Sequence, residues 1–371
     1  MENANVARHL QSAARVFPEA DALRVPARGG GYRAFSFREL AGVVAGMAAR
    51  FRQRGIGAGT RVIVLAKPGF ELIAAVFALL HVGAVPVVID PGMGREKFLM
   101  CVRRTQPEAL VAVPLARAVA ALFRESFRSC RVRVALDRRF VDRCTGAFAE
   151  VTPSGSALTS VEPLSPEAPA AVLFTSGSTG APKGVCYTHG MFEAQIAQVR
   201  SAFGIAPGEV DFPMLPVFSL FNPALGMATV VPQMNPSRPA RADAATLIRA
   251  LRQERVTNTF GSPAVWARVV RATEAQGVTF PEVKRVLMAG APCPAWLLER
   301  LQKLVPNGEI HTPYGATEVL PVSSITAREV LAETRALTET GRGTCVGRPL
   351  PGVEVRIIAI DEAVIRAWGD A

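Results

Sequence analysis

The strongest chemical signal in the sequence is a loop rich in glycine and hydroxyl residues. Residues 173–184 read LFTSGSTGAPKG and follow an apolar strand predicted over residues 171–175. Such a loop offers backbone N–H groups, hydroxyl donors and the ammonium of Lys183 to a polyphosphate. It is not a Walker A loop, because Pro182 precedes the lysine and Gly184 follows it. A flexible linker is the alternative, but a linker needs neither the strand before the loop nor the helix that follows near Thr188.

Two further clusters follow predicted strands. Residues 314–318 (YGATE) come after a strand predicted over 309–313, and residues 290–292 (GAP) come after one predicted over 285–289. Ligand sites in open α/β sheets lie beyond the carboxyl ends of the strands. There an aromatic ring can stack on a base, a hydroxyl can contact phosphate, and a carboxylate can hold Mg²⁺. Each cluster alone could be an ordinary turn or helix cap, but three in chain order favour a nucleotide site.

In this order and at these spacings, the three motifs resemble the adenylate-forming (AMP-binding) superfamily. That superfamily includes acyl-CoA synthetases, luciferases and the adenylation domains of peptide synthetases. The resemblance extends from about Phe35 onward and implies the large N-terminal α/β domain of the acyl-CoA synthetase-like fold. It also implies ATP, AMP and Mg²⁺ as ligands and a carboxylic acid as substrate.

The resemblance assigns roles to named residues. The β- and γ-phosphates of ATP would be held by Thr175, Ser176, Gly177, Ser178, Thr179, Gly180 and Lys183. The adenine and the adenylate would lie against Gly290, Ala291, Pro292, Tyr314, Gly315 and Ala316. Thr317 would contact the α-phosphate and Glu318 would coordinate Mg²⁺, so that Lys183, Thr317 and Glu318 are the expected catalytic residues. His189 also follows the loop, and a structural role is expected for it.

The segment 215–226 departs from the pattern of acyl-CoA synthetases, which usually carry a histidine where this chain has Ser219. Together with residues 235–240 and 260–264, it looks like the β-lactone synthetases of bacterial olefin biosynthesis. Those enzymes adenylate a long-chain β-hydroxy acid, whose own hydroxyl then displaces AMP. Neutral variation at Ser219 is the alternative, so a fatty acyl-CoA synthetase or fatty acyl-AMP ligase stays open. A non-catalytic nucleotide- or acyl-binding module also stays open.

A second departure lies beyond residues 347–352 (GRPLPG). Family members continue there with an Asp that binds the ribose hydroxyls, a hinge and a small C-terminal lid domain with a catalytic lysine. The resemblance implies that these parts are absent from the 371 residues and that this chain has little activity alone. The general base of any second step is not assigned.

The elements that must position these motifs have an α/β pattern. Strands predicted over residues 61–66 and 85–89 flank a helix predicted over 70–82, a βαβ unit that favours a parallel sheet. Further strands are predicted over residues 109–113, 131–136, 229–231 and 258–261, and helices over 115–127, 191–203, 244–254, 263–275 and 294–304. We expect one α/β subdomain over residues 1–165, a second with the AMP-binding motifs over 166–345, and the start of a small β subdomain over 346–371. A strand is expected at 353–360.

Composition narrows the class of protein. Hydrophobic residues make up 49% of the chain and charged residues 20%, which indicates a globular fold rather than disorder. The net charge is +11, but the basic residues are spread along the chain and do not alternate with aromatic ones. We therefore expect no nucleic-acid partner. Anionic substrates, a peripheral membrane contact or pathway enzymes remain open as partners, and so does the oligomeric state.

The spacing of the cysteines and one long uncharged segment bear on where the protein is located in the cell. The six cysteines form no CxxC pair and the four histidines have no zinc-like spacing, so free thiols in a reducing cytoplasm are expected. Residues 72–89 carry no formal charge, but His81, Gly83 and Pro86 favour a helix, a turn and a buried strand over a membrane span.

Overall fold

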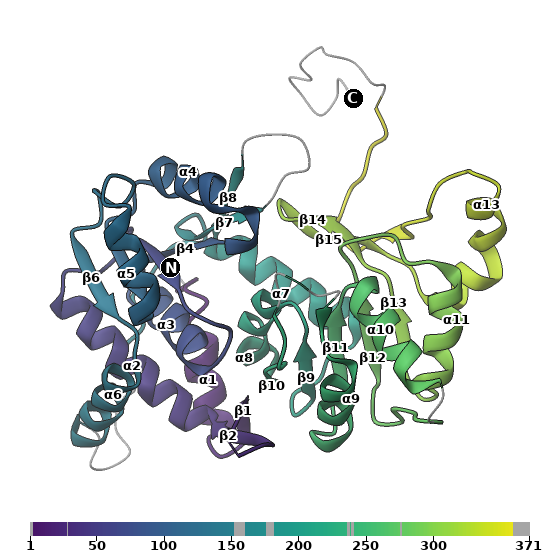
Figure 1. Ribbon diagram of the computed structural model, residues 1–371, viewed down its shortest axis with the longest axis horizontal. Coiled ribbons are helices and arrows are strands. Elements are labelled where there is room, and N and C mark those ends of the chain that lie inside the picture. Colours follow the sequence, from purple (N-terminus) through teal and green to yellow (C-terminus); the bar gives the residue numbers. More distant parts are fainter. Residues whose placement is uncertain are drawn as a thin grey trace.

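The computed structural model describes residues 3–27, 29–151, 160–175, 182–235, 238, 241–274 and 277–358. Within these residues the strands pair into two large sheets and one small sheet (Figure 1). The first large sheet has the order β6 (Val132–Ala135), β5 (Ala109–Ala112), β3 (Arg61–Leu65), β4 (Val85–Ile89), β7 (Pro169–Thr175) and β8 (Lys183–Thr188). The second has the order β13 (Glu309–His311), β12 (Arg285–Met288), β11 (Asn258–Gly261), β9 (Val210–Pro213), β10 (Ala228–Val230), β1 (Asp21–Pro26) and β2 (Tyr32–Ser36).

Both large sheets are parallel apart from one strand at an edge. In the first, Ile63 lies opposite Val87 on one neighbour and Leu110 on the other. Val62 and Val64 belong to one buried cluster, whereas Ile63 belongs to another. Successive side chains point to opposite faces of a strand, so this strand fills a core on each side. Apolar runs such as Arg61–Leu65 are typical of parallel strands that are buried on both faces.

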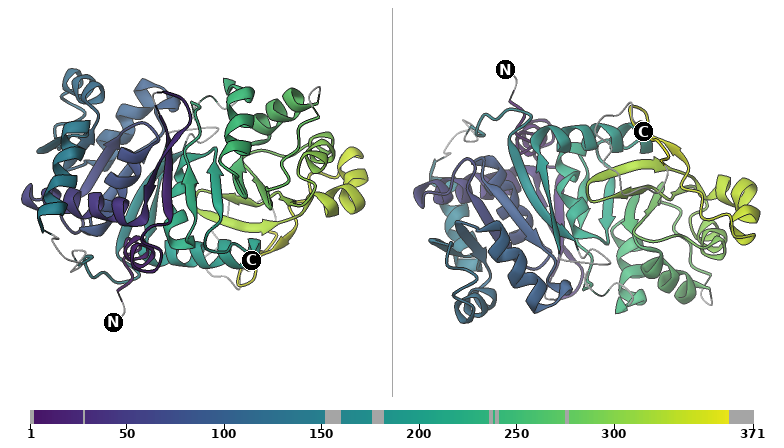
Figure 2. Two further views of the ribbon diagram at one scale, coloured as in Figure 1. Left: turned by 90° about the horizontal axis from the view of Figure 1, so that it is seen from below. Right: turned by 90° about the horizontal axis from the view of Figure 1, so that it is seen from above.

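Helices cover the faces of these sheets, as the two views of Figure 2 show. They are α1 (Arg8–Val16), α2 (Phe37–Gln53), α3 (Phe70–His81), α4 (Arg95–Thr105), α5 (Pro114–Leu122), α6 (Arg138–Val151), α7 (His189–Phe203), α8 (Asn222–Leu225), α9 (Ala244–Gln253), α10 (Pro263–Thr273), α11 (Ala295–Leu304), α12 (Ala327–Glu329) and α13 (Arg335–Glu339). Helix α2 begins with a capping box, in which the Glu39 N–H donates to Ser36 Oγ (3.1 Å) and the Ser36 N–H donates to the Glu39 carboxylate (2.7 Å).

The small sheet consists of β14 (Tyr314–Ala316), β15 (Val319–Ser324) and β16 (Arg348–Pro349), all antiparallel. It lies at the carboxyl side of the second large sheet and carries the YGATE motif. The described residues also include two 3₁₀-helices, η1 (Pro91–Met93) and η2 (Pro216–Leu220), and one π-helix, η4 (Val330–Thr334).

Strand pairing crosses the predicted boundary at residue 165 in both directions. Strands β1 and β2 lie near the start of the chain but join the second sheet, where β1 pairs with β10. Strands β7 and β8 follow residue 165 but join the first sheet, where β7 pairs with β4. In Figure 2 the two halves of the molecule lie side by side, so these exchanged strands link them. The division into units at residues 165 and 345 stays a prediction.

Most predicted elements are confirmed. Residues 72–89 form most of α3, a turn and β4, and no helix in the described part of the chain is long and apolar enough to cross a membrane. The six cysteines are free thiols. The strand predicted at 353–360 is wrong where the structure describes it, because residues 353–358 form no strand and Ile357 is 93% exposed. Alternating apolar residues stabilise a strand only where a neighbouring strand and a core face cover them.

Candidate nucleotide and acyl site

The glycine-rich loop connects two antiparallel strands. Thr175, the last residue of β7, lies opposite Lys183, the first residue of β8. The expected phosphate ligands Ser176, Gly177, Ser178, Thr179 and Gly180 lie outside the described residues. The sequence suggested a strand, a loop and then a helix, but a second strand comes between the loop and α7. Helix α7 begins only at His189, where the Met191 N–H donates to Thr188 Oγ1 (3.2 Å).

Gly184 lets this hairpin close over an aromatic ring. A Cβ atom at Gly184 would lie 2.8 Å from Cζ of Phe174, which faces it across the β7–β8 pair. A larger residue would push the ring or the strand aside. Lys183 is the first residue of β8, and its side chain is exposed.

The YGATE motif forms a two-residue β-hairpin rather than a helix cap. Ala316 on β14 pairs with Val319 on β15, which leaves Thr317 and Glu318 at the turn. A Cβ atom at Gly315 would lie 2.7 Å from the Val319 carbonyl oxygen, so the turn needs glycine at that position. Tyr314 is 53% exposed, which leaves its ring face available to a planar ligand.

Two side chains missed by the sequence analysis tie the hairpin to the first half of the molecule. The Tyr187 hydroxyl on β8 donates to the Thr317 carbonyl oxygen, and Gln195 Nε2 on α7 donates to the Leu320 carbonyl oxygen (2.9 Å). Lys183 and Tyr187 lie four residues apart on one face of β8, so their Cα atoms are roughly 13 Å apart. The strand that begins with the loop lysine therefore also carries the contact to the Thr317 turn.

The GAP motif is the turn that follows β12. Gly290 has a φ of +90°, a conformation that costs an L-residue energy and that glycine adopts freely. Nothing lies within 4 Å of the position of its absent Cβ, and Ala291 and Pro292 are exposed. The turn thus presents bare backbone toward open space, which a flat ring can approach.

One large cleft brings seven of the predicted residues together. It has a volume of about 1790 Å³. Its lining includes Gly290, Ala291, Pro292, Tyr314, Gly315, Ala316 and Thr317. Glu318 is the next residue along the turn, and its negative charge contributes to the raised pKa of Tyr187, after burial as the main cause. Lys183 is not among the residues that line this cleft, but it begins β8, the strand whose Tyr187 does line it.

The same cleft continues into an apolar space between the two halves. Leu173 and Phe174 of β7 line it from the first sheet, and Phe260 and Leu287 line it from the second. Ser219, in η2, is buried and lines the cleft at the place where a gating histidine was expected in acyl-CoA synthetases. An elongated apolar space next to a polar end suits an amphipathic acid.

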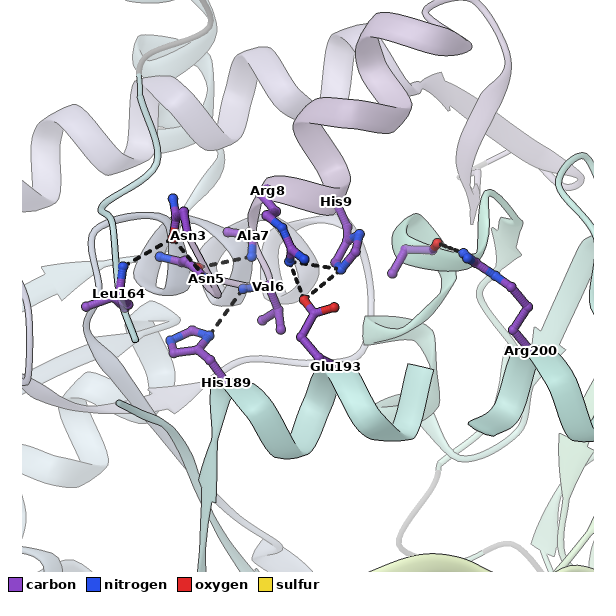
Figure 3. A network of polar contacts seen from close by, with 11 residues as sticks. Asn3, Asn5, Val6, Ala7, Arg8, His9, Leu164, His189, Glu193 and Arg200 are labelled. Atoms are coloured by element: carbon purple, nitrogen blue, oxygen red, sulfur yellow. Dashed lines mark hydrogen bonds and ion pairs between the residues drawn. The ribbon is translucent and has the colours of Figure 1, made fainter. Parts of the chain in front are cut away.

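His189 belongs to a network that holds the N-terminal segment against α7 (Figure 3). The Val6 N–H donates to His189 Nδ1 (3.2 Å), and Glu193 pairs with Arg8 and with His9 Nε2 (2.7 Å). Burial lowers the pKa of His189 to about 4, so the imidazole is neutral and accepts this hydrogen bond. These contacts agree with the structural role expected for His189.

The comparisons with known proteins decide the family. A model of the AMP-binding enzyme family matches residues 10–367. The chain belongs to the AMP-binding enzyme family.

Two curated relatives within reach of sequence comparison carry the same enzyme name. The chain is 41% identical over 375 residues to an olefin beta-lactone synthetase of Stenotrophomonas maltophilia, covering 99% of this chain and 67% of that protein. It is 40% identical to an olefin beta-lactone synthetase of Xanthomonas campestris, covering 98% of this chain and 66% of that protein. It thus spans about two thirds of the length of these relatives.

Similarity to solved structures bears on the fold alone. The crystal structure of VinN matches with a TM-score of 0.76 at 20% identity and covers 97% of this chain and 84% of VinN. The inhibitor-bound N-terminal domain of FACL13 from Mycobacterium tuberculosis matches with a TM-score of 0.77 at 18% identity, covering 95% and 83% of the two chains. The acyl-CoA synthetase-like fold expected from the sequence is therefore confirmed.

The residues present are compatible with the Mg²⁺ expected for the family. In the described part of the chain no three His, Cys, Asp or Glu side chains gather into a metal cluster. Glu318 is exposed at the hairpin turn and adjacent to Thr317 in the cleft. Magnesium in phosphate sites is commonly held by one or two carboxylates together with substrate phosphates and water. A single carboxylate beside a phosphate site fits that pattern.

Proposed function

We propose that this chain is the nucleotide- and acid-binding part of an adenylate-forming ligase that activates a long-chain β-hydroxy acid and closes it to a β-lactone. The observation that supports this most is the continuity of the cleft. Its polar end carries the GAP and YGATE motifs, and its other end is apolar and lined by both sheets. The two relatives at 40–41% identity carry the name olefin beta-lactone synthetase, which supports the specific reaction.

The first step joins the acid to the nucleotide. A carboxylate oxygen attacks the α-phosphorus of ATP, the new O–P bond forms, and the bond to pyrophosphate breaks. Because both reactants are anions, positive charge and hydrogen-bond donors must offset their repulsion. In the proposed arrangement Lys183 and the loop hold the β- and γ-phosphates, while Thr317 contacts the α-phosphate. Glu318 would hold Mg²⁺, which when bound neutralises part of the phosphate charge.

The Tyr187 contact supports this geometry. Its hydroxyl fixes the carbonyl of Thr317 and thereby the position of the turn relative to the strand that carries Lys183. Phosphoryl transfer depends mainly on positioning and electrostatic stabilisation, so a link between the two phosphate-binding segments has a direct role. We assign Tyr187 as a positioning residue.

The second step releases AMP. The β-hydroxyl oxygen of the bound acyl adenylate attacks its own acyl carbonyl carbon, the carbon–oxygen bond to AMP breaks, and the hydroxyl proton passes to a base. No thiol enters this reaction, so a CoA gate is not needed. Ser219 in place of a histidine is consistent with that difference from acyl-CoA synthetases.

The test combines binding with product analysis. A stable sulfamoyl analogue of a 3-hydroxyacyl adenylate should bind this chain more tightly than AMP, because it fills both ends of the cleft. Reactions of the protein with Mg-ATP and a long-chain β-hydroxy acid should yield AMP, pyrophosphate and a β-lactone without CoA. Formation of acyl-CoA only when CoA is added would favour a fatty acyl-CoA synthetase instead. ATP binding with no pyrophosphate release would favour a non-catalytic binding module.

A further inference from the structure

Helix α5 presents an apolar face to solvent. Its sequence, residues 114–122 (PLARAVAAL), has a single charged residue, yet Ala120 is the only residue of the helix that is buried. Leu115 is 77% exposed, Val119 46% and Leu122 80%. Residues three and four positions apart lie on the same face of a helix, so these three side chains form one continuous strip, the α5 stripe. Contiguous exposed apolar surface of this kind marks an interaction site.

The α5 stripe borders the cleft. Leu115 and Val119 are exposed and also belong to the cleft lining. Side chains that are both exposed and part of the lining lie at an opening, so the cleft reaches the surface beside α5. The partly buried side chains below this mouth are apolar and also line the cleft: Phe98 and Leu99 on α4, and Ala116 and Phe123 on or next to α5.

A row of level residues joins this mouth to the strand that leads into the glycine-rich loop. Phe174 on β7 lies opposite Ile89 on β4, and the parallel register of β3 and β4 places Leu65 level with Ile89. The Val113 N–H, after β5, donates to the Leu65 carbonyl oxygen (3.0 Å). All four residues line the cleft. With about 4.8 Å between neighbouring strands, the three steps from β7 to β5 span roughly 14 Å. An apolar arm of the cleft therefore runs across the first sheet to α5.

The segment that contains the mouth is positively charged. Residues 95–133, which include α4, α5 and β6, carry nine Arg or Lys and three Glu, a net charge of +6 out of +11 for the whole chain. Eight of the nine basic residues are exposed, and Arg117 is the exception. Of the three glutamates, Glu108 forms an ion pair in the described part of the chain, and its partner is Arg61 on β3. The positive charge of the segment is thus not neutralised within the described structure.

Two exposed cations lie at the mouth itself. Lys67, two residues after β3, and Arg95, the first residue of α4, are exposed and line the cleft. Asp90 lines it too, but its carboxylate caps η1 by accepting a hydrogen bond from the Gly92 N–H (2.8 Å). An apolar helix face bordered by cations is the pattern of helices that lie at the surface of an anionic membrane. Their apolar side chains enter the acyl boundary while the cations remain at the lipid phosphates.

A second copy of this chain fits the same surface less well. A two-fold interface places the same patch of both subunits against itself. Here that would bring two segments of net charge +6 together. Three apolar side chains on one helix are also far fewer than the roughly 20–30 residues that each partner contributes to a standard protein interface.

We propose that the α5 stripe and the cations at the adjoining mouth of the cleft form a docking surface for an anionic lipid bilayer. Leu115, Val119 and Leu122 enter the lipid, and Lys67 and Arg95 face its phosphates. A long-chain acid dissolved in that bilayer then lies at the mouth of the apolar arm. This consequence for the acid rests on the proposed function, whereas the docking itself does not.

The experiment measures binding of this chain to large unilamellar vesicles by co-sedimentation. Vesicles of phosphatidylcholine and phosphatidylglycerol, at about 3:1, have a negative surface and should bind the chain, whereas pure phosphatidylcholine should bind it much less. Binding to the anionic vesicles should weaken at about 1 M salt, where the screening length falls to roughly 3 Å.

Two leucine substitutions locate the docking surface. Leu122→Ser removes an exposed side chain of the α5 stripe that does not line the cleft, and should weaken vesicle binding roughly tenfold. Leu337→Ser is the matched control, because Leu337 is 49% exposed on α13, at the opposite side of the molecule from α5 (Figure 1). It should leave vesicle binding unchanged. Both leucines are exposed, so both variants should keep the unfolding temperature of the wild type.

Three results would contradict the proposal. They are equal binding, or none, to the two kinds of vesicle; vesicle binding that Leu122→Ser does not weaken; and an equal loss for Leu337→Ser. A dimer that forms without lipid and that Leu122→Ser dissociates would make this face an interface between copies instead. Titration with Mg-ATP in the absence of vesicles tests the proposed function separately. Vesicle binding without nucleotide binding would contradict that function and support the docking surface.

Discussion

Replacing Asp211 by asparagine should change how the stability of the protein depends on pH. Burial raises the folded-state pKa of Asp211 from 3.8 to about 6. The folded protein therefore binds this proton more tightly than the unfolded chain, and the group lowers stability as pH rises from about 4 to about 6. A rise of about two pH units at about 1.4 kcal/mol each gives roughly 3 kcal/mol of stability that the wild type loses across this window. The Asp211→Asn variant has no titratable group at this position, so it should not lose this stability as pH rises.

Urea unfolding at about pH 4 and about pH 7.5 measures this effect as a difference between the two proteins. The stability of Asp211→Asn relative to wild type should improve by roughly 3 kcal/mol between the two conditions. Asp243→Asn is a control whose stability relative to wild type should stay nearly constant between the two conditions. The Thr246 hydroxyl is the main cause that lowers the pKa of the Asp243 carboxyl at the start of α9 below its ordinary value of 3.8, so this group is mostly ionised at both pH values in the folded and the unfolded chain. A difference between wild type and Asp211→Asn that does not change with pH would refute the reasoning.

Three further substitutions test the nucleotide end of the cleft. Tyr187→Phe keeps the ring stack on Phe192 (4.9 Å between centroids) but removes the donor to Thr317. Loss of about 1 kcal/mol should weaken Mg-ATP binding roughly fivefold by calorimetry, and unchanged affinity would count against a positioning role. Lys183→Ala should weaken ATP binding more than AMP binding, and equal losses in two parallel titrations would argue against contact with the outer phosphates. Glu318→Gln should remove the dependence of ATP binding on Mg²⁺; a titration with and without EDTA checks this, and persistent dependence would contradict the metal assignment.

The parallel sheets were largely predictable because buried parallel strands are continuous apolar runs. The β3–α3–β4 unit is such a case, since its strands and helix occur where the pattern indicated them. Strand β8 was not predicted, because KGVCYT directly follows a loop and its strand character depends on pairing with β7. The prediction that a helix directly follows the glycine-rich loop was therefore wrong, because the loop connects the antiparallel strands β7 and β8.

Contacts between distant residues could not be predicted from one sequence. Tyr187 and Thr317 lie 130 residues apart, and only the packing of the small sheet on β8 brings them together. Asp211 and Asn258 lie 47 residues apart and meet because β9 and β11 pair with these two residues opposite each other. Neither residue has a motif of its own, so this buried polar contact had no signal in the sequence. The GAP and YGATE motifs did have one, because their chemistry is local to single turns.

The central claim is that the cleft bounded by the GAP and YGATE turns binds an adenine nucleotide. Calorimetric titration of this chain with Mg-ATP, and then with AMP, tests it most directly. We predict binding of both at millimolar affinity or tighter, with ATP binding dependent on Mg²⁺ and AMP competing for the same site. Absence of binding for both nucleotides, in a sample shown to be folded, would contradict the account.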